Sequence, residues 1–166
     1  MLFRQLQLSF RVDPPGPLPI LVYTVAPADT TLEYLLLRRT QSRGGFWQGV
    51  SGVAEPGEAL DEAAIRELAE QTGLAPIRLM AVNYHYTFPP PKRVAGSTPH
   101  LQHITERVFL ALLSAKVDPM IDPTEHDAWD WFTYEEALMW LRRPENIEAL
   151  RQCEKLINPG ELDRRP

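Results

Sequence analysis

Two glutamates and a glutamine lie close together between positions 67 and 71 of the chain. Glu67, Glu70 and Gln71 are three and four positions apart, so a helix would place their side chains on one face. Carboxylates crowded in this way repel one another unless a positive group lies between them. Hard oxygen donors at this spacing suit Mg²⁺ or Mn²⁺, which keep several waters and accept phosphate oxygens at their other positions. A solvated acidic helix face is the alternative interpretation.

The segment that carries these side chains has the clearest helical pattern in the sequence. Between Glu58 and Thr72, leucines and alanines recur at a spacing near 3.6 residues and predict one buried face. Acidic residues suit the positive beginning of this helix, and Gly73 is placed to end it in a left-handed conformation. Before the helix, Gly52 and Gly57 permit a tight loop in which backbone groups can approach a phosphate or a metal.

Six residues of this region have the identities and spacing of a known motif: Gly52, Glu58, Arg66, Glu67, Glu70 and Gly73. The segment 52–74 closely resembles the Nudix box, G-x5-E-x7-R-E-U-x-E-E-x-G-U with U apolar, and matches eight of its nine specified positions. At about 7% usage per residue type, six identities arise by chance on the order of 10⁻⁷ times per starting position. The departure is Gln71, where the family usually has a third glutamate.

The resemblance implies a divalent-metal-dependent hydrolase of diphosphate linkages. In that family the box glutamates bind the metal, which implies Glu67 and Glu70 as catalytic ligands for Mg²⁺ or Mn²⁺. Gln71, through its oxygen, and the backbone at Gly52 complete the implied metal site. Arg66 belongs to the same catalytic group, and its implied role is to orient a neighbouring glutamate by a charge-assisted hydrogen bond. The family's chemistry is attack of a metal-activated water on the diphosphate linkage.

Similarity outside the box adds two further candidates. The stretches 46–52 and 124–131 and the last predicted helix are similar to the bacterial dihydroneopterin triphosphate pyrophosphohydrolases, one branch of the family. Glu125 precedes a predicted strand at a place where many members have a further glutamate. The resemblance implies a metal ligand or general base there, with an ordinary loop acid as the alternative. Trp47 either stacks on a base or pterin or packs against the sheet.

Cationic residues are the candidates for binding substrate phosphates beside the metal. Arg39 ends a predicted strand, and Lys92 and Arg93 lie in a predicted loop from Pro89 to His103. This loop is interpreted as a lid that grips the substrate, or else as a solvated surface loop. The predicted partner is therefore a small phosphorylated molecule.

The predicted elements follow one another as strands, a helix, strands and two helices. Strands are expected at 2–12, 20–26, 32–39, 50–53, 77–88, 104–113 and 129–132, and helices at 58–72, 133–141 and 144–157. This order predicts an α+β fold, an α/β/α sandwich with helices packed on a mixed sheet. At 166 residues without a low-complexity linker, we expect a single Nudix domain over 1–166, with the box at 52–74 and the C-terminal helices within 133–157.

Charge and cysteine content exclude several classes of protein. A formal net charge of −5 argues against a protein that coats polymeric nucleic acid. Cys153 is the single cysteine, so an internal disulfide is excluded. The longest nearly apolar stretch, 20–28, is far shorter than the ~18 residues of a membrane span, and we see no apolar block of a signal peptide. We expect a cytoplasmic monomer or homodimer that binds no membrane.

The acidic imbalance lies in the segment that resembles the box. From Glu55 to Gln71 there are six acids and one base, so this segment carries the whole formal charge of −5. The predicted function is Mg²⁺-dependent hydrolysis of a diphosphate linkage in a nucleoside or pterin triphosphate, such as dihydroneopterin triphosphate. The alternatives are a catalytically impaired nucleotide-binding or sensor module, suggested by Gln71, and a Nudix hydrolase of ADP-ribose, dinucleoside polyphosphates or oxidised nucleotides.

Overall fold

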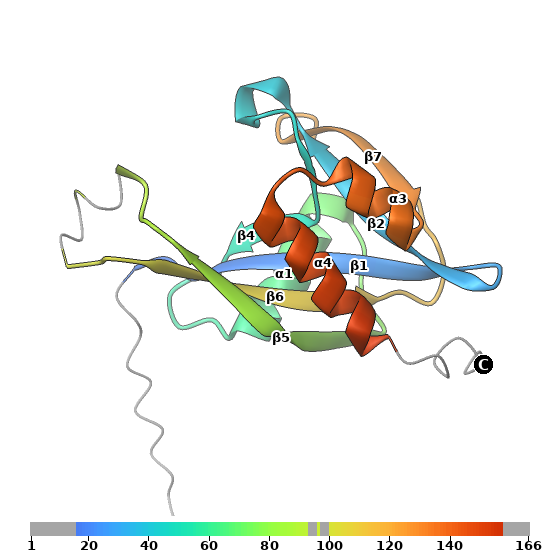
Figure 1. Ribbon diagram of the computed structural model, residues 1–166, viewed down its shortest axis with the longest axis horizontal. Coiled ribbons are helices and arrows are strands. Elements are labelled where there is room, and N and C mark those ends of the chain that lie inside the picture. Colours follow the sequence, from blue (N-terminus) through green and yellow to red (C-terminus); the bar gives the residue numbers. More distant parts are fainter. Residues whose placement is uncertain (1–15, 93–95, 97–99, 158–166) are drawn as a thin grey trace, which may run out of the picture.

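The strands and helices follow the predicted order in the part of the chain that the structure, a computed structural model, describes: residues 16–92, 96 and 100–157. In chain order they are β1 (Pro19–Ala28), β2 (Thr31–Arg39), the short 3₁₀ helix η1 (Gln41–Arg43), β3 (Trp47–Gln48), β4 (Val50–Val53), α1 (Leu60–Thr72), β5 (Arg78–Phe88), β6 (Ile104–Leu112), β7 (His126–Phe132), α3 (Tyr134–Trp140) and α4 (Pro144–Leu156). The predicted strand at 2–12 lies outside the described residues. Figure 1 shows these elements around the long central strand β1.

The described strands form one mixed sheet in which β1 is central. One edge of β1 pairs in parallel with β6, which pairs antiparallel with β5. The other edge is shared, because β4 pairs with Pro19–Val22 and β2 with Thr24–Ala28. From there β2 also pairs with β3 and β7. The sheet therefore divides beside β1, with β4 on one branch and β2, β3 and β7 on the other.

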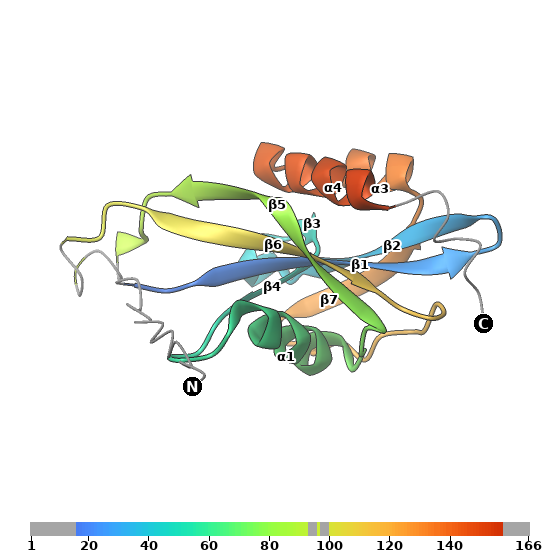
Figure 2. The same cartoon turned by 90° about the horizontal axis from the view of Figure 1, so that it is seen from below.

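Helices cover both faces of the sheet, as Figure 2 shows: α1 lies below it and α3 and α4 lie above it. The α+β prediction of an α/β/α sandwich is confirmed. Within the described part of the chain, no helix is long and apolar enough to cross a membrane.

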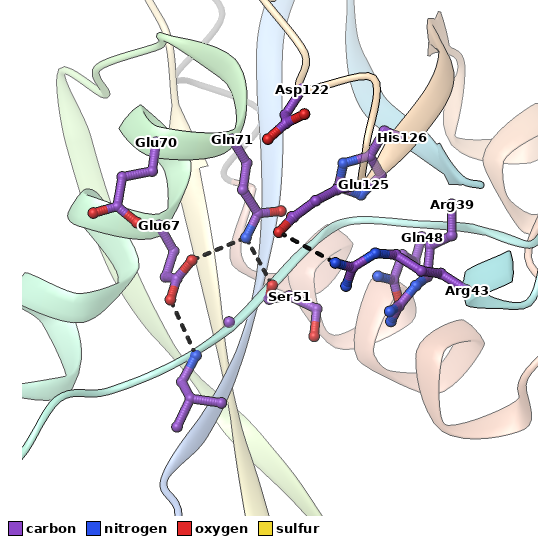
Figure 3. A pocket seen from close by; sticks show the side chains of 12 residues that line it. Arg39, Arg43, Gln48, Ser51, Glu67, Glu70, Gln71, Asp122, Glu125 and His126 are labelled. Atoms are coloured by element: carbon purple, nitrogen blue, oxygen red, sulfur yellow. Dashed lines mark hydrogen bonds and ion pairs between the residues drawn. The ribbon is translucent and has the colours of Figure 1, made fainter.

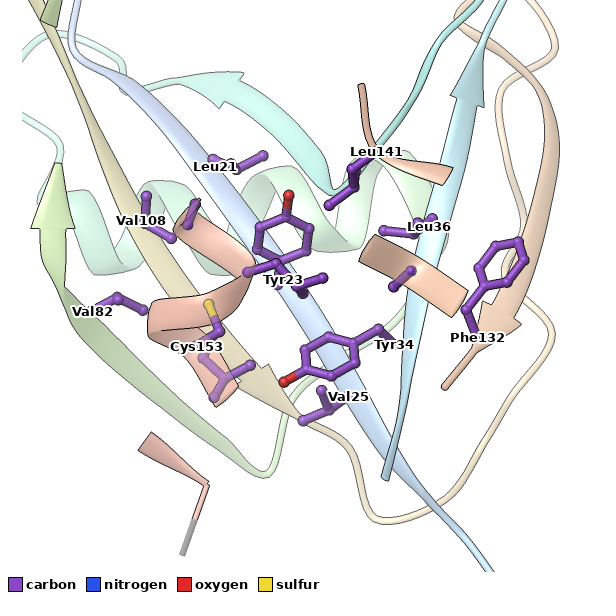
Figure 4. Packing of buried hydrophobic residues seen from close by; sticks show 14 residues of the cluster. Leu21, Tyr23, Val25, Tyr34, Leu36, Val82, Val108, Phe132, Leu141 and Cys153 are labelled. Atoms are coloured by element: carbon purple, nitrogen blue, oxygen red, sulfur yellow. The ribbon is translucent and has the colours of Figure 1, made fainter. Parts of the chain in front are cut away.

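Alternate residues of the central strands supply the two hydrophobic layers. On β1, Leu21 and Tyr23 pack under α3 and α4, whereas Ile20 and Val22 pack over α1. All four side chains are at most 1% exposed. Figure 4 shows the layer beneath α3 and α4, where the buried Tyr23 hydroxyl donates to the Asn146 carbonyl of α4 at 2.9 Å. A strand buried on both faces reads as a continuous apolar run, which is the pattern of β1 in the sequence.

The ends of the helices agree with their local sequence. Gly73 ends α1 with a φ of 71°, the left-handed conformation that glycine adopts without strain. Thr133 begins α3 with a capping box: its side chain accepts from the Glu136 N–H at 3.3 Å, and its own N–H donates to the Glu136 carboxylate at 2.9 Å. Both predicted helix ends are confirmed.

Most boundaries agree with the predictions to within one or two residues, and two of the differences have a clear cause. Helix α1 begins at Leu60 rather than Glu58, because the Glu58 N–H donates to the Glu55 carbonyl at 3.0 Å in a turn before the helix. Strand β7 begins at His126 rather than Trp129, because it continues to pair with β2 past an irregularity in the register. Strand β3 has only two residues, too few for a hydrophobic period to reveal it.

We predict that Leu68→Ala lowers the free energy of unfolding by about 2–5 kcal/mol, because the Leu68 side chain is fully buried between α1 and the sheet. Ile65 lies on the same helix with 45% of its surface exposed and serves as the matched control. Ile65→Ala should change stability by no more than about 0.5 kcal/mol. Urea unfolding of both variants checks this, and equal losses would contradict the assigned face of α1.

Candidate active site

The guanidinium of Arg66 binds the carboxylate of Glu58, just before α1, and those of Glu67 and Glu70 on α1 itself. Its Nε and Nη2 donate to the two oxygens of Glu58 at 2.8 and 3.0 Å, a bidentate pair. Its Nη1 donates to Glu67 and Glu70, at 3.2 Å each, and Nη2 also donates to the Val53 carbonyl at 3.0 Å. The hydrogen bonds from Arg66 lower the pKa of Glu58 from 4.5 to about 2, and those to Glu58 raise the pKa of Arg66. Arg66 thus neutralises carboxylates that would otherwise repel one another.

The side chain of Glu67 is packed against the backbone of β4. A Cβ atom added at Gly52 would lie 2.1 Å from Glu67 Cδ, so this close approach requires glycine. The Val53 N–H donates to Glu67 Oε1 at 3.2 Å, and only 13% of the Glu67 side chain is exposed. The first glycine of the motif is therefore a contact between strand and helix.

Gln71 lies beside Glu67 on α1, and its side chain acts as a hydrogen-bond donor. The amide nitrogen donates to the Ser51 carbonyl at 2.8 Å and to Glu67 Oε2 at 2.9 Å, the dashed lines at the centre of Figure 3. A carbonyl and an ionised carboxylate only accept, so this pattern assigns the nitrogen of the amide, not its oxygen, to that side. The sequence interpretation had Gln71 offering its oxygen to a metal. In the structure, the amide nitrogen, not the oxygen, faces the Ser51 carbonyl and the Glu67 carboxylate.

A cavity of about 410 Å³ opens where the sheet divides, between α1, β4 and the turn before β7. Its lining residues are Arg39, Arg43, Gln48, Ser51, Gly52, Val53, Glu67, Glu70, Gln71, Asp122, Glu125 and His126. Figure 3 shows Glu67 and Glu70 on the α1 side, both arginines on the opposite side, and Asp122 and Glu125 on the turn before β7. The cavity therefore has an acidic wall and a basic wall.

Glu125 enters this cavity from the turn that precedes β7. Its backbone carbonyl accepts from the Thr40 N–H at 3.0 Å, and its Oε1 lies 3.8 Å from Arg43 Nη2. The turn itself is fixed by Asp122, which accepts from the Thr124 N–H at 2.8 Å and from the Thr124 hydroxyl at 2.7 Å. These hydrogen bonds lower the pKa of Asp122. The turn thus brings a carboxylate from a distant part of the sequence into the cavity of the α1 glutamates.

The basic wall contains nitrogen atoms that have no partner within the described structure. Arg39 Nε and His126 Nδ1 are both buried, and neither forms a hydrogen bond with any described residue. Burial lowers the pKa of both side chains, and repulsion by Arg43 lowers that of Arg39 further. The Arg39 guanidinium also lies over the ring of Phe46, 5.5 Å from its centroid. This wall can therefore offer donors to an anion.

Three predicted residues within the described structure, Trp47, Lys92 and Arg66, do not line the cavity. Trp47 packs edge-on against Phe132 at 5.5 Å between ring centroids and against Trp140 at 5.7 Å, so it takes the packing role rather than a stacking position. Lys92 is exposed beyond the end of β5 and does not line the cavity. Arg93 lies outside the described residues. Arg66 also does not line the cavity and acts through the carboxylates that it binds.

Arg43, Asp122 and the carbonyl of Ser51 are cavity groups that sequence reasoning missed. Arg43 follows Arg39 after a short turn, and that basic pair flanking a turn was an available signal. Asp122 begins an Asp-Pro-Thr stretch, which indicates a side-chain-capped turn. A backbone carbonyl such as that of Ser51 leaves no mark in the sequence.

The chain belongs to the Nudix family, because the NUDIX domain model matches residues 18–153. It is 34% identical over 131 residues to an octanoyltransferase of Myxococcus xanthus and 32% identical over 108 residues to the NAD-capped RNA hydrolase ndx-9 of Caenorhabditis elegans. These matches cover 78% and 63% of this chain but 35% and 26% of the relatives. The chain therefore spans about a third or less of the curated relatives it matches.

Solved structures share the fold over most of their length. A NUDIX hydrolase structure from Listeria monocytogenes has a TM-score of 0.70 at 24% identity and covers 84% of this chain and 92% of that one. The dihydroneopterin triphosphate pyrophosphohydrolase of E. coli has a TM-score of 0.65 at 25% identity, over 81% and 92%. A C. elegans Ap4A hydrolase has a TM-score of 0.65 at 22% identity, over 84% and 96%. These enzymes act on different molecules, so the fold does not identify the substrate.

Nudix hydrolases generally use divalent metals, and the chemistry of the acidic wall suits one. Glu67, Glu70 and Glu125 supply the oxygen donors that Mg²⁺ and Mn²⁺ prefer. As they stand, no three acidic, histidine or cysteine side chains of the described residues converge on one point. The side chains of Glu70 and Glu125 are 59% and 38% exposed and can turn toward an ion, whereas the Gln71 nitrogen is occupied by Ser51 and Glu67.

We predict that Glu58→Gln destabilises the protein at neutral pH and that this difference disappears in acid. Because Arg66 lowers the pKa of Glu58 from 4.5 to about 2, the ionised pair stabilises the fold above pH 4.5 and loses that effect as the pH falls toward 2. Urea unfolding of both proteins across this range checks the trend. Glu135→Gln, an exposed acid on α3, is the control. A stability difference that is constant with pH would contradict the pairing.

Proposed function

We propose that this chain is a divalent-metal-dependent pyrophosphohydrolase that cleaves a diphosphate linkage in a nucleoside or pterin triphosphate. The observation that carries the proposal is a single cavity lined by acidic and basic side chains, with Glu67 and Glu70 on one side, Arg39 and Arg43 on the other, and Glu125 beside Arg43. A triphosphate needs both a cation held by carboxylates and direct cationic partners for its remaining oxygens. Similarity to the E. coli dihydroneopterin triphosphate enzyme supports this substrate class.

We propose that Glu70 and Glu125 hold Mg²⁺ or Mn²⁺ and that Glu67 supports them without binding the ion. Glu67 is the least exposed of the three, and it already accepts hydrogen bonds from Val53, Arg66 and Gln71. When bound, a divalent ion lowers the pKa of water and neutralises charge that develops on the bridging oxygen. Arg66 positions Glu67 and Glu70 rather than touching the substrate.

In the proposed reaction, water attacks one phosphorus of the linkage, and the bond from that phosphorus to the bridging oxygen breaks. A triphosphate then yields a monophosphate and diphosphate, and the proton of the attacking water passes to a carboxylate. Glu125 is our candidate for this acceptor, because it faces the cavity beside Arg43. Arg39 and Arg43 donate to phosphate oxygens, and His126 Nδ1 is available to the same anion.

We expect the purified protein, given Mg²⁺, to release diphosphate from dihydroneopterin triphosphate or a nucleoside triphosphate. The panel also contains oxidised nucleotides, ADP-ribose and dinucleoside polyphosphates, and mass spectrometry identifies the products. Glu70→Gln and Glu125→Gln should each lower kcat by about 10²–10⁴-fold, the range for loss of a charged catalytic group.

Glu135→Gln is the matched control for this assay, because it removes an exposed carboxylate outside the cavity. Full activity in the Glu70 and Glu125 variants would refute the proposed acidic wall. Turnover of ADP-ribose or dinucleoside polyphosphates alone would refute the triphosphate preference while leaving the hydrolase class intact.

We expect Arg39→Gln to raise KM for the triphosphate by about 10–100-fold with a smaller change in kcat, because a charge-assisted hydrogen bond to phosphate contributes roughly 1.5–3 kcal/mol. Arg39 Nε is buried at the cavity and has no partner among the described residues. Arg107→Gln, an exposed arginine on β6 outside this cavity, is the control. An unchanged KM would show that the basic wall does not bind the phosphates.

A catalytically impaired nucleotide-binding module is the second candidate function. The specific observation in its favour is Gln71, whose amide nitrogen is directed at Glu67 and Ser51. The same substrate panel distinguishes the two functions. Tight binding with no product in either Mg²⁺ or Mn²⁺ would favour the binding module over the enzyme.

A further inference from the structure

Two oxygen atoms from different elements converge on the side-chain amide of Gln71. The Ser51 carbonyl of β4 and the Glu67 carboxylate of α1 lie 2.8 and 2.9 Å from its nitrogen. The amide has two N–H groups, so each oxygen receives one. Gln71 is only 8% exposed, which makes this bridge a buried connection between strand and helix at the wall of the cavity.

A carboxylate at position 71 would reverse the chemistry of this bridge. It would bring acceptor oxygens against an acceptor carbonyl and an ionised carboxylate, with no hydrogen to share among them. Such a set of buried oxygens is unfavourable unless a proton or a cation lies between them. The N–H groups of the Gln71 amide therefore supply the positive charge density between these oxygens that a metal ion would otherwise supply.

We propose that the Gln71 amide takes the place of one divalent cation between Ser51 and Glu67, so that this chain binds one metal ion fewer than its Gln71→Glu variant. This proposal rests on the proposed function in one respect: it assumes that Glu70 and Glu125 bind the remaining metal. Glu67 then serves as a hydrogen-bonded support for α1, because Val53, Arg66 and Gln71 together satisfy both of its oxygens without a metal.

Replacement of the cation by the neutral Gln71 amide also changes which interaction joins β4 to α1 at the cavity. In this chain, the contact between β4 and α1 at Ser51 is a hydrogen bond that needs no metal ion. In the Gln71→Glu variant, the same contact would depend on a divalent ion. The proposal therefore predicts that metal removal weakens this contact in the variant and leaves it intact in the unaltered protein.

The test compares the full chain with its Gln71→Glu variant by counting bound Mn²⁺ in equilibrium dialysis and by thermal unfolding in EDTA and in MnCl₂. We expect the variant to bind one additional Mn²⁺ per chain. In EDTA its Tm should fall by roughly 3–8 °C, because a buried hydrogen-bonded bridge becomes a repulsive contact. In MnCl₂ its Tm should rise by more than that of the unaltered protein.

Two further variants act as controls. Gln71→Leu removes the amide without adding charge, so its Tm should fall in EDTA, with no additional bound Mn²⁺. Gln48→Glu adds a carboxylate to another buried position of the same cavity, on β3. It should bind no additional Mn²⁺, because it does not join Ser51 to Glu67.

Equal Mn²⁺ counts for the unaltered protein and Gln71→Glu would overturn the proposal. So would a Gln71→Glu variant whose Tm in EDTA is not lowered, or one that remains unfolded even when refolded with MnCl₂. Folding that requires MnCl₂ would support the proposal, because it shows that the ion replaces the amide. None of these readouts uses a substrate, so an inactive protein can still meet every expectation.

Discussion

The bidentate contact between Arg66 and Glu58 is the interaction on which the site depends. It joins α1 to the loop before it, and the remaining donors of the same guanidinium reach Glu67, Glu70 and the Val53 carbonyl. The carboxylates can therefore gather at one wall without a metal, since their charge is balanced from inside the protein. The contacts form a chain: Arg66 ties α1 to Glu58, α1 presents Glu67, and Glu67 packs on Gly52 of β4.

The division of the sheet beside β1 determines where the remaining groups of the site can lie. Because β4 and β2 share one edge of β1 in succession, the cavity lies between the two branches of the sheet, beside α1. The turn before β7 returns to this space, tied to the end of β2 by the hydrogen bond from the Thr40 N–H to the Glu125 carbonyl. Arg39 and Glu125, which are far apart in sequence, thus line the same cavity.

Much of the fold was predictable from local patterns. The apolar run of β1, the capping box at Thr133 and the glycine after α1 each have a direct physical meaning, and each occurs in the structure as expected. The motif likewise indicated the family, which the domain match confirms. The direction of the Gln71 amide was not predictable, because it depends on the Ser51 carbonyl twenty residues earlier. Nor was the packing of Trp47, whose partners Phe132 and Trp140 come from the far end of the chain.

Under the proposed function, the opposite charges of the two cavity walls bear on how an anionic substrate would arrive. The field of each wall is screened within about 8 Å at physiological ionic strength. The chain as a whole carries a formal charge of −5, so at low ionic strength a polyphosphate approaches a protein of its own sign. Attraction begins only when the anion is already near Arg39 and Arg43. Recognition is then a short-range event after encounter, and added salt speeds the encounter rather than slowing it.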